Sequence, residues 1–417
     1  MSDHGMIIIG AGETGARAAA ELRSLGWAGR ITLIGEEAHA PYERPPLSKQ
    51  MLQEEDQPSP ASILLAEHTA EQRIELRKAY KAVAIDTRNH RITLNDGSSL
   101  TYERLLLATG AQPRKLASPQ PGSDSPLAWT GVFYLRTYGD AVSLRERLQP
   151  RKRIAVIGGG FIGLEVAASA RARGCEVTVI EAGPRILMRG VPEAIAGIVA
   201  ARHQSAGVQF KLGSAIAGMS SSKEEYLIRF GNGDSLACDT IVAGIGAIPE
   251  TALASESGLA VENGILVDER LATSDPDIFA AGDCCSFPHP LYGGRRIRLE
   301  SWRNAQDQGT HAAGSMLGAA AAYAAVPWFW SDQYDLTLQV AGLPDAGTTT
   351  VHRSLGAKGD LFFHLTAENR LAAASGIGGP GIAKDIRLAE MIIASQAVLD
   401  AEVLTQPELK LKALLRS

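Results

Sequence analysis

The residues best suited to chemistry lie in two glycine-rich turns. Gly10, Gly12 and Gly15 form the pattern G-x-G-x-x-G, and Gly158, Gly160 and Gly163 repeat it. In such a turn the first glycine bends the chain, the second lets a pyrophosphate approach the backbone, and the third lets a helix pack closely on a strand. The free N–H groups and positive dipole end of that helix face the phosphates. One match is weak evidence, but two in one chain predict two dinucleotide sites.

A carboxylate follows each turn at the distance expected of a ribose ligand. Glu36 or Glu37 comes after the apolar strand 31–34, and Glu181 closes the strand that follows the second turn. A carboxylate at this point can accept hydrogen bonds from both hydroxyls of an adenosine ribose. The first segment alone leaves the choice between Glu36 and Glu37 open.

The residues after Glu181 indicate which nicotinamide cofactor binds. Ala182, Gly183 and Pro184 place no cation where the 2′-phosphate of NADPH would lie. This favours NADH over NADPH. Arg185 is close enough to keep NADPH as the alternative.

Each turn stands in a strand, turn, helix and strand, which is the context that makes the pattern informative. The first such segment is 6–36, and segment 153–181 repeats it almost element for element. A stiff loop follows the first segment, because residues 41–49 contain three prolines and lead to a short helix near Ser48. Its cations Arg44 and Lys49 could supply positive charge beside a pyrophosphate and an electron-accepting ring. The alternative is surface charge on a rigid loop.

Small residues at strand ends predict further points of close approach to a ligand. The buried strand 105–110 ends in Ala108, Thr109 and Gly110, and segment 240–247 mirrors it, with Ile245 and Gly246 expected near the space between the two nucleotide domains. Asp283 follows a glycine at the C-terminal end of another strand, the edge where open α/β sheets bind ligands. Its alternative role, favoured by the sequence alone, is an N-cap of the next helix.

The order of these elements predicts an α/β protein. We expect two Rossmann-like nucleotide-binding domains, each with three ββα layers, and a C-terminal α+β domain. The expected boundaries are 1–115 with 246–326 for the first, discontinuous domain, 116–245 for the second and 327–417 for the third. A proline-bearing loop at 112–126 marks the first boundary.

Shorter elements complete this expectation. Segments 82–86 and 91–94, followed by a turn at 95–97, predict an antiparallel addition to the first sheet. In the third domain, alternating segments 336–340, 348–351 and 361–365 predict strands, and 382–395 predicts a helix.

Composition excludes several classes of protein. The 417 residues are 45% apolar and 21% charged, with a formal charge of −5, which argues against a general nucleic-acid or membrane-surface binder. No apolar run is long enough to span a membrane. The four cysteines show neither a disulfide framework nor metal-ligand spacing, so we expect no metal site and a reducing compartment. With no signal peptide in view, we expect a cytoplasmic protein.

Over nearly its whole length the chain resembles the FAD-dependent ferredoxin reductases that feed Rieske-type dioxygenases and bacterial cytochrome P450 systems, in the pyridine nucleotide-disulfide oxidoreductase superfamily. The resemblance rests on GAGETG, PYERPPLSK, LLLATGAQPR, VIGGGFIGLE, TSDPDIFAAGD, ESWRNAQDQG and PWFWSDQYDL. It implies an enzyme with FAD and NADH as cofactors, which takes hydride from NADH onto FAD and passes electrons singly to a [2Fe–2S] ferredoxin.

The resemblance also implies roles for individual residues. FAD would be held by the first glycine turn together with Glu36, rather than Glu37, Arg44, Lys49, Val83, Ala108, Thr109, Gly110, Arg114, Asp283 and Trp302. NADH would be held by the second glycine turn with Glu181, Ile245 and Gly246. Lys49, Glu165 and Trp302 would be the catalytic residues, with Glu165 near the nicotinamide and paired with Lys49. Glu13 departs from the pattern, because it brings a carboxylate close to the expected phosphates, and we expect it to point into solvent or to pair locally.

The same resemblance suggests where the ferredoxin binds. Trp328, Phe329 and Trp330 would lie near the exposed flavin edge, although an ordinary aromatic core is the alternative. Arg295, Arg296, Arg298 and Arg303 are a candidate docking face for an acidic ferredoxin, and a solvated basic strand is the alternative.

Two other functions compete with this one. Flavin disulfide reductases and NADH oxidases need a redox cysteine beside the flavin, but the first cysteine of this chain is Cys175, and we expect the vicinal Cys284 and Cys285 to be structural. A redox-sensing protein like the apoptosis-inducing factors would usually carry a targeting segment and a long insertion in the third domain, and neither is evident.

Overall fold

The computed structural model of the chain describes residues 5–54, 56, 59–64, 66–117, 131–188, 190–222 and 225–415. The chain forms two compact units. The first holds residues 1–43, 60–112 and 248–329, and the second holds 44–59, 113–247 and 330–417. The finer division into three domains stays a prediction, and part of its first boundary loop, 118–126, lies outside the described residues.

A seven-stranded sheet is the centre of the first unit. Its order is β3 (Ile74–Lys78), β2 (Ile31–Gly35), β1 (Gly5–Ile9), β6 (Ser99–Leu107), β5 (Arg91–Leu94) and β4 (Ala82–Asp86), with β19 (Ile278–Ala280) beside β6. β3, β2, β1, β6 and β19 pair in parallel, whereas β4 and β5 are antiparallel additions. Every residue of β1 and β2 is buried, as expected of a parallel sheet covered on both faces. The predicted Rossmann-like sheet and its antiparallel addition are confirmed.

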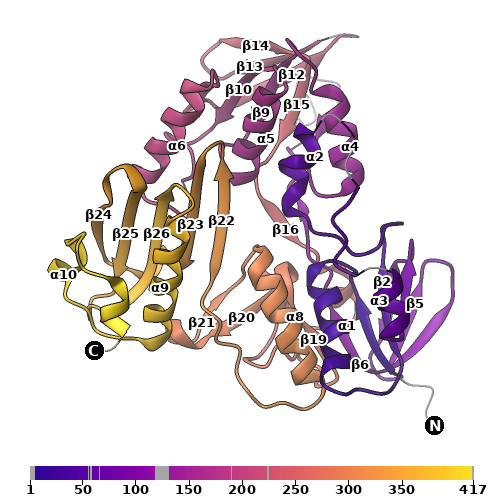
Figure 1. The fold of residues 1–417 in the computed structure, drawn as a ribbon. Helices are drawn as coiled ribbons and strands as arrows, with labels where there is room; N and C mark the ends of the chain where they lie inside the picture. Colours follow the sequence, from indigo (N-terminus) through magenta and orange to yellow (C-terminus); the bar gives the residue numbers. More distant parts are fainter. Residues whose placement is uncertain are drawn as a thin grey trace. The chain divides into compact units, whose positions relative to one another are not determined.

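Two long helices of the first unit, α1 (Glu13–Ser24) and α8 (Trp302–Met316), pack against each other (Figure 1). Their approach requires a glycine, because a Cβ atom on Gly309 would lie 2.4 Å from the carbonyl oxygen of Thr14. The remaining elements are short: α3 (Ala66–Glu71), α7 (Ala252–Glu256), η2 (Gly282–Cys284), η3 (Pro290–Tyr292), and a sheet of β17 (Val261–Glu262), β18 (Gly264–Leu266), β20 (Cys285–His289) and β21 (Arg295–Ile297).

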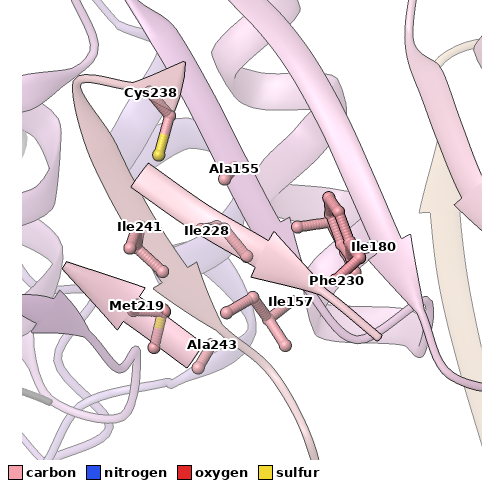
Figure 2. Packing of buried hydrophobic residues seen from close by; sticks show 9 residues of the cluster. All are labelled: Ala155, Ile157, Ile180, Met219, Ile228, Phe230, Cys238, Ile241 and Ala243. Carbon is pink, nitrogen blue, oxygen red and sulfur yellow. The ribbon is translucent and has the colours of Figure 1, made fainter. Parts of the chain in front are cut away.

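The second unit contains a parallel sheet of the same kind. Its order is β11 (Gln209–Leu212), β10 (Glu176–Glu181), β9 (Arg153–Ile157), β15 (Thr240–Ala243) and β8 (Val132–Phe133). An antiparallel sheet of β12 (Ile216–Ser221), β13 (Tyr226–Phe230) and β14 (Ser235–Cys238) packs with it. Figure 2 shows the apolar cluster that both sheets share, in which Ile157, Ile180 and Ile241 meet Ile228 and Phe230. This core fixes the strand ends that carry Gly158 and Glu181.

Helices α4 (Tyr138–Arg147), α5 (Phe161–Ala172) and α6 (Glu193–Ser205) belong to the second unit. The segment 44–59 belongs there as well, although it follows the first glycine turn in sequence. Its two adjacent prolines start the 3-10 helix η1 (Pro45–Ser48), so the predicted short helix, α2 (Gln50–Gln53), begins two residues later than expected. α2 packs against α4 and α5.

The C-terminal part of the second unit is an antiparallel sheet in the order β22 (Trp328–Gln333), β23 (Leu336–Gly342), β26 (Leu371–Gly378), β25 (Gly359–Leu365) and β24 (Thr349–Ser354). Helix α9 (Ile382–Ser395) covers β23 and β26 (Figure 1). The three predicted strands and the predicted helix are confirmed. The sequence pattern missed β26 because all of its residues are buried, so they show no polar alternation.

Several minor elements complete the chain: β7 (Ala111–Pro113), β16 (Ala247–Pro249), η4 (Pro344–Ala346), η5 (Gly356–Lys358), α10 (Ala401–Thr405) and η6 (Leu411–Leu415). Among the described residues, no helix is both long enough and apolar enough to cross a membrane.

Candidate functional site

The first glycine turn has the shape of a pyrophosphate cradle. Gly10 has φ +112°, and a Cβ atom on it would lie 2.1 Å from the carbonyl oxygen of Ala108. A Cβ atom on Gly15 would lie 2.0 Å from the carbonyl oxygen of Gly10. At Gly12, by contrast, a Cβ atom would meet nothing within 4 Å, and no side chain caps the helix α1 that begins there. The turn is therefore closed where it packs and open where phosphate oxygens would approach, and the residues present fit the pyrophosphate of FAD.

The second glycine turn reproduces this geometry. Gly158 has φ +105°, and a Cβ atom on it would lie 2.4 Å from the carbonyl oxygen of Gly244. Gly163 is held against the carbonyl oxygen of Gly158, because its Cβ atom would lie 2.1 Å away. The nearest atom to a Cβ on Gly160 would be 4.0 Å away. This turn fits the pyrophosphate of a second dinucleotide.

The two acids after the first turn have different surroundings. Glu36 is 70% exposed and pairs with Lys81 at 3.2 Å, whereas Glu37 accepts a hydrogen bond of 2.5 Å from the hydroxyl of Tyr42. Glu36 thus has a carboxylate that is largely exposed, and its role as the ribose ligand stays a prediction.

Glu181 is held by the backbone next to the second turn. Its two carboxylate oxygens accept hydrogen bonds of 2.8 Å from the N–H groups of Gly159 and Gly183, which keeps the carboxylate at the end of β10. Arg185 donates to the carbonyl oxygens of Ile186 and Leu187, at 3.1 and 2.9 Å. The guanidinium group is therefore engaged with the backbone of its own loop.

Glu13 pairs rather than pointing freely into solvent. Its Oε1 atom accepts hydrogen bonds of 2.8 Å from Arg17 and from Gln306 on α8. The expectation of local pairing is met by Arg17, and Gln306 is an additional partner that the sequence did not indicate.

The strand ends of the first unit bring several predicted residues together. Thr109 donates from its hydroxyl to the carbonyl oxygen of Glu250 at 2.6 Å, and Gly110 accepts from the N–H of Glu250 at 2.9 Å. Ala108 is buried behind Gly10. Val83 lies on β4 with an exposed side chain.

Asp283 does not cap a helix. It lies inside the 3-10 helix η2, which starts after Ala281, and its carbonyl oxygen accepts from Arg298 at 3.2 Å. The N-cap alternative is therefore wrong. Its neighbour Gly282 donates from the N–H to Oε1 of the buried Gln308 at 2.7 Å, and Nε2 of Gln308 is buried with no partner among the described residues. Gln308 is a further polar group at the edge where FAD is expected, and sequence reasoning missed it.

The second unit holds four of the remaining candidates. The N–H of Arg114 donates to the carbonyl oxygen of the exposed Gly246 at 2.9 Å, next to the half-buried Ile245. Arg44 donates to the carbonyl oxygen of Arg136 at 2.6 Å.

In the first unit, Trp302 is half-buried and is the first residue of α8, where Ser301 accepts from the N–H of Asn304 as the N-cap.

Lys49 and Glu165 form the ion pair expected from the resemblance. Nζ of Lys49 lies 3.1 Å from Oε2 of Glu165, which is only 5% exposed. The Lys49 ammonium also lies 5.9 Å from the ring centroid of Trp330. Ser48 donates to Oε2 at 2.5 Å and Ser331 donates to Oε1 at 2.6 Å. Neither serine was predicted, because a single serine far away in the sequence carries no signal of its partner.

Most of the arginines predicted as a docking face have internal partners. Arg296 donates to the carbonyl oxygens of Val267 and Ser286. Arg298 pairs with Glu300, and Arg303 pairs with Asp307 one helical turn away at 3.1 Å. Arg295 and Arg296 are the two of the four that are exposed.

The four cysteines are buried free thiols. Burial raises the pKa of the Cys284 thiol, and it raises the pKa of the Cys285 thiol well above its usual range. Sγ of Cys285 donates to Oε1 of Gln308 at 3.0 Å. These thiols are poor nucleophiles, since the thiolate is the reactive form.

Comparison with known proteins gives consistent matches over the whole chain. The sequence model described as pyridine nucleotide-disulphide oxidoreductase matches residues 4–309, and the reductase C-terminal model matches residues 328–415. The chain is 39% identical over 416 residues, covering 100% of both chains, to the anthranilate 1,2-dioxygenase system ferredoxin–NAD(+) reductase component of Burkholderia cepacia.

Two solved structures are similar throughout. The ferredoxin reductase for the CYP199A2 system from Rhodopseudomonas palustris is 36% identical, with a TM-score of 0.90 over 98% of this chain and 99% of that one. Putidaredoxin reductase, in its covalent complex with putidaredoxin, is 33% identical, with a TM-score of 0.91 over 100% of this chain and 99% of that one.

Proposed function

Because the chain belongs to the pyridine nucleotide-disulphide oxidoreductase family, we propose that it is an NADH-dependent, FAD-containing reductase of a [2Fe–2S] ferredoxin that feeds an oxygenase. The observation that carries this proposal is the pair of Lys49 with the buried Glu165, two residues beyond the second glycine turn. When bound, FAD accepts a hydride from NADH and gives the two electrons one at a time to a one-electron acceptor.

The chain supplies binding and electrostatics for this reaction. Gly10, Gly12 and Gly15 cradle the pyrophosphate of FAD at the start of α1, and Glu36 accepts hydrogen bonds from the ribose. Asp283 and Gln308 provide polar groups at the carboxyl edge of the first sheet, which is where open α/β sheets bind their ligands.

NADH is bound by the equivalent parts of the second unit. Gly158, Gly160 and Gly163 cradle its pyrophosphate, and Glu181 accepts from its ribose through the lone pairs that the backbone leaves available. The hydrogen bonds of Arg185 to backbone carbonyl groups support NADH over NADPH, because they hold part of the guanidinium to its own loop.

Lys49 provides a fixed positive charge. A preorganised cation stabilises the electron density that the accepting ring gains, without reorganising at the moment of transfer. Glu165 holds the ammonium in place. The reaction itself needs no nucleophile from the protein.

The buried thiols support this function over that of a disulfide reductase or NADH oxidase. Such enzymes need a reactive cysteine beside the flavin, whereas Cys284 and Cys285 are buried free thiols with raised pKa values. A sensor like the apoptosis-inducing factors is the second alternative, and it would hold a slow, long-lived charge-transfer complex with NADH instead of turning over.

Anaerobic mixing of the holoprotein with NADH tests the proposal. We expect rapid bleaching of the visible flavin absorbance, followed by reduction of an added [2Fe–2S] ferredoxin. Slow bleaching with a persistent long-wavelength band would favour the sensor, and electron flow that requires a protein disulfide would favour the disulfide reductase.

The ferredoxin docking face is a separate proposal. Arg295 is its best candidate, because its side chain is exposed whereas those of Arg298 and Arg303 are half-buried. Arg295→Glu should slow ferredoxin reduction by NADH and leave ferricyanide reduction unchanged. Equal loss of both activities would contradict a docking role. We also propose a cytoplasmic location, which the four free thiols support, and cell fractionation would test it.

A further inference from the structure

Glu165 accepts hydrogen bonds on both of its carboxylate oxygens. Oε2 accepts from the hydroxyl of Ser48, the last residue of η1, and pairs with the ammonium of the next residue, Lys49. Oε1 accepts from the hydroxyl of Ser331, on β22, at 2.6 Å. The acid is buried on helix α5. Three segments that are far apart in the sequence therefore meet at a single carboxylate.

The hydrogen bonds continue beyond Ser331. Oγ of Ser331 lies 2.9 Å from Nε2 of Gln333, which is two residues along the same strand and so on the same face. Oε1 of Gln333 lies 2.9 Å from Nε2 of His203 on α6. All three side chains are fully buried.

The direction of every hydrogen bond in this chain follows from its end at Glu165. A carboxylate facing an ammonium group is an acceptor, so the hydroxyl of Ser331 must donate its only proton to Oε1 of Glu165. Ser331 must then accept from the amide of Gln333. The amide carbonyl of Gln333 accepts in turn from Nε2–H of His203. All three donors therefore point toward Glu165, and such aligned hydrogen bonds strengthen one another.

His203 ends the chain without adding a second charge. Burial lowers the pKa of its imidazole to about 4, so the ring is neutral at physiological pH. Its Nδ1 atom is buried with no partner among the described residues, as expected of a neutral ring that donates from Nε2. The rings of Phe210 and Tyr334 pack against it at 6.2 and 5.0 Å between centroids.

We propose that Ser331, Gln333 and His203 are positioning residues for hydride transfer: their hydrogen-bond chain holds the Glu165 carboxylate, and through it the Lys49 ammonium, in the geometry that the reaction requires. The proposal rests on the proposed function. It means that β22 of the C-terminal sheet contributes to the redox site through Glu165. Without Ser331, a buried carboxylate oxygen would lose its donor, which is costly for a charged acceptor, and Glu165 would pair more tightly with Lys49.

The test compares Ser331→Ala with Thr337→Val. Thr337 also donates from a hydroxyl to a carboxylate in the same hairpin, but its partner is Asp332 at 3.2 Å, outside the chain of hydrogen bonds. In anaerobic stopped-flow mixing, Ser331→Ala should lower the limiting rate of flavin reduction by NADH roughly tenfold. The Kd for NADH and the flavin content should stay close to wild type. Thr337→Val should leave the limiting rate unchanged.

A second variant protects the test against misfolding. Gln333→Met keeps the side-chain volume but cannot donate to Ser331, and it should lower the limiting rate by a smaller factor than Ser331→Ala. The flavin midpoint potential should become more negative in both variants, because the Lys49 charge is more fully neutralised. Thermal unfolding and flavin content identify any variant that fails to fold.

A double-mutant cycle separates positioning from general support. In a Glu165→Gln background, Ser331→Ala should change neither the limiting rate nor the potential further, because the acceptor it serves is no longer a carboxylate. An additive loss in that background would overturn the proposal, and so would a wild-type rate and potential in folded Ser331→Ala. Failure of wild-type protein to be reduced by NADH would instead overturn the proposed function.

Discussion

The two glycine turns share a backbone but differ in what packs beside them. Thr14 precedes the third glycine of the first turn and is 6% exposed, whereas Ile162 occupies the same position in the second turn and is 49% exposed. Thr14 is enclosed because a Cβ atom on Gly282 or Gly309 would lie 2.4 Å from its oxygen atoms. The residue before the third glycine is therefore covered by neighbouring elements in the first turn and half exposed in the second.

This difference shows how one local motif can serve two tasks. Both turns are open at the second glycine, where a phosphate would approach, so the difference lies in how firmly the start of each helix is held. The neighbours packed on Thr14 hold the start of α1, which suits a cofactor kept through many cycles. The start of α5 at Ile162 is less enclosed, which suits a substrate that exchanges. The glycine pattern sets the shape of the phosphate cradle, and the packing around it suits the cradle to retention or exchange.

The largest expected effect comes from adding a methyl group to the first glycine of each turn. Gly10→Ala and Gly158→Ala both force a side chain to positive φ and against a carbonyl oxygen, a strain of about 1–3 kcal/mol before the clash is counted. Gly10→Ala should yield protein nearly free of FAD, measured by the ratio of flavin to protein absorbance. Gly158→Ala should keep its FAD and bind NADH roughly 10- to 100-fold more weakly. Equal flavin loss in both variants would contradict the assignment of FAD to the first turn and NADH to the second.

Removing the ribose carboxylates should give a smaller version of the same contrast. Glu36→Ala should weaken FAD binding about tenfold, since a hydrogen bond to a charged group contributes about 1.5–3 kcal/mol. Glu181→Ala should raise the Kd for NADH and leave the flavin content normal. Glu37→Ala is the control, because that carboxylate accepts from Tyr42. Normal FAD retention in Glu36→Ala would contradict the assignment.

Exchanging the residues before the third glycines tests the packing difference directly. Thr14→Ile should destabilise the protein by about 1–3 kcal/mol, because the extra methylene has no space in a packed site. Ile162→Thr should change the unfolding free energy by about 0.5 kcal/mol or less, as at other exposed positions. Urea unfolding followed by circular dichroism measures both, and similar losses would mean that the second turn is as tightly covered as the first.

The smallest expected effect is on the thiols. Titration of the denatured protein should find four free thiols before reduction and the same four after reduction by NADH. A gain of two thiols on reduction would reveal a disulfide in the oxidised protein and place part of the redox chemistry on cysteine.

The glycine turns could be predicted from the sequence because their chemistry is local. Six glycines within two short segments specify both the backbone shape and the ligand group. The pairing of Lys49 with Glu165 came from resemblance to a family, and the structure confirms that the two side chains meet.

The partners of Glu165 could not be predicted in the same way. Ser331 lies 166 positions from Glu165 in the sequence, and a serine in a strand carries no mark of what it will donate to. The arginines of segment 295–298 show a second limit. Arg296 is exposed, as a charged stretch predicts, but the sequence does not indicate that it also donates to the carbonyl oxygens of Val267 and Ser286. Long-range packing decides both cases.

The membership of segment 44–59 in the second unit sets a rule for building chimeras. Nicotinamide preference would ordinarily be engineered by transplanting the continuous stretch 113–247 between relatives. That transplant would carry Glu165 into a host whose equivalents of Ser48, Lys49 and Ser331 come from another protein. A functional module must therefore be cut as three pieces of chain, with 44–59 and strand β22 travelling alongside the stretch that contains the second glycine turn.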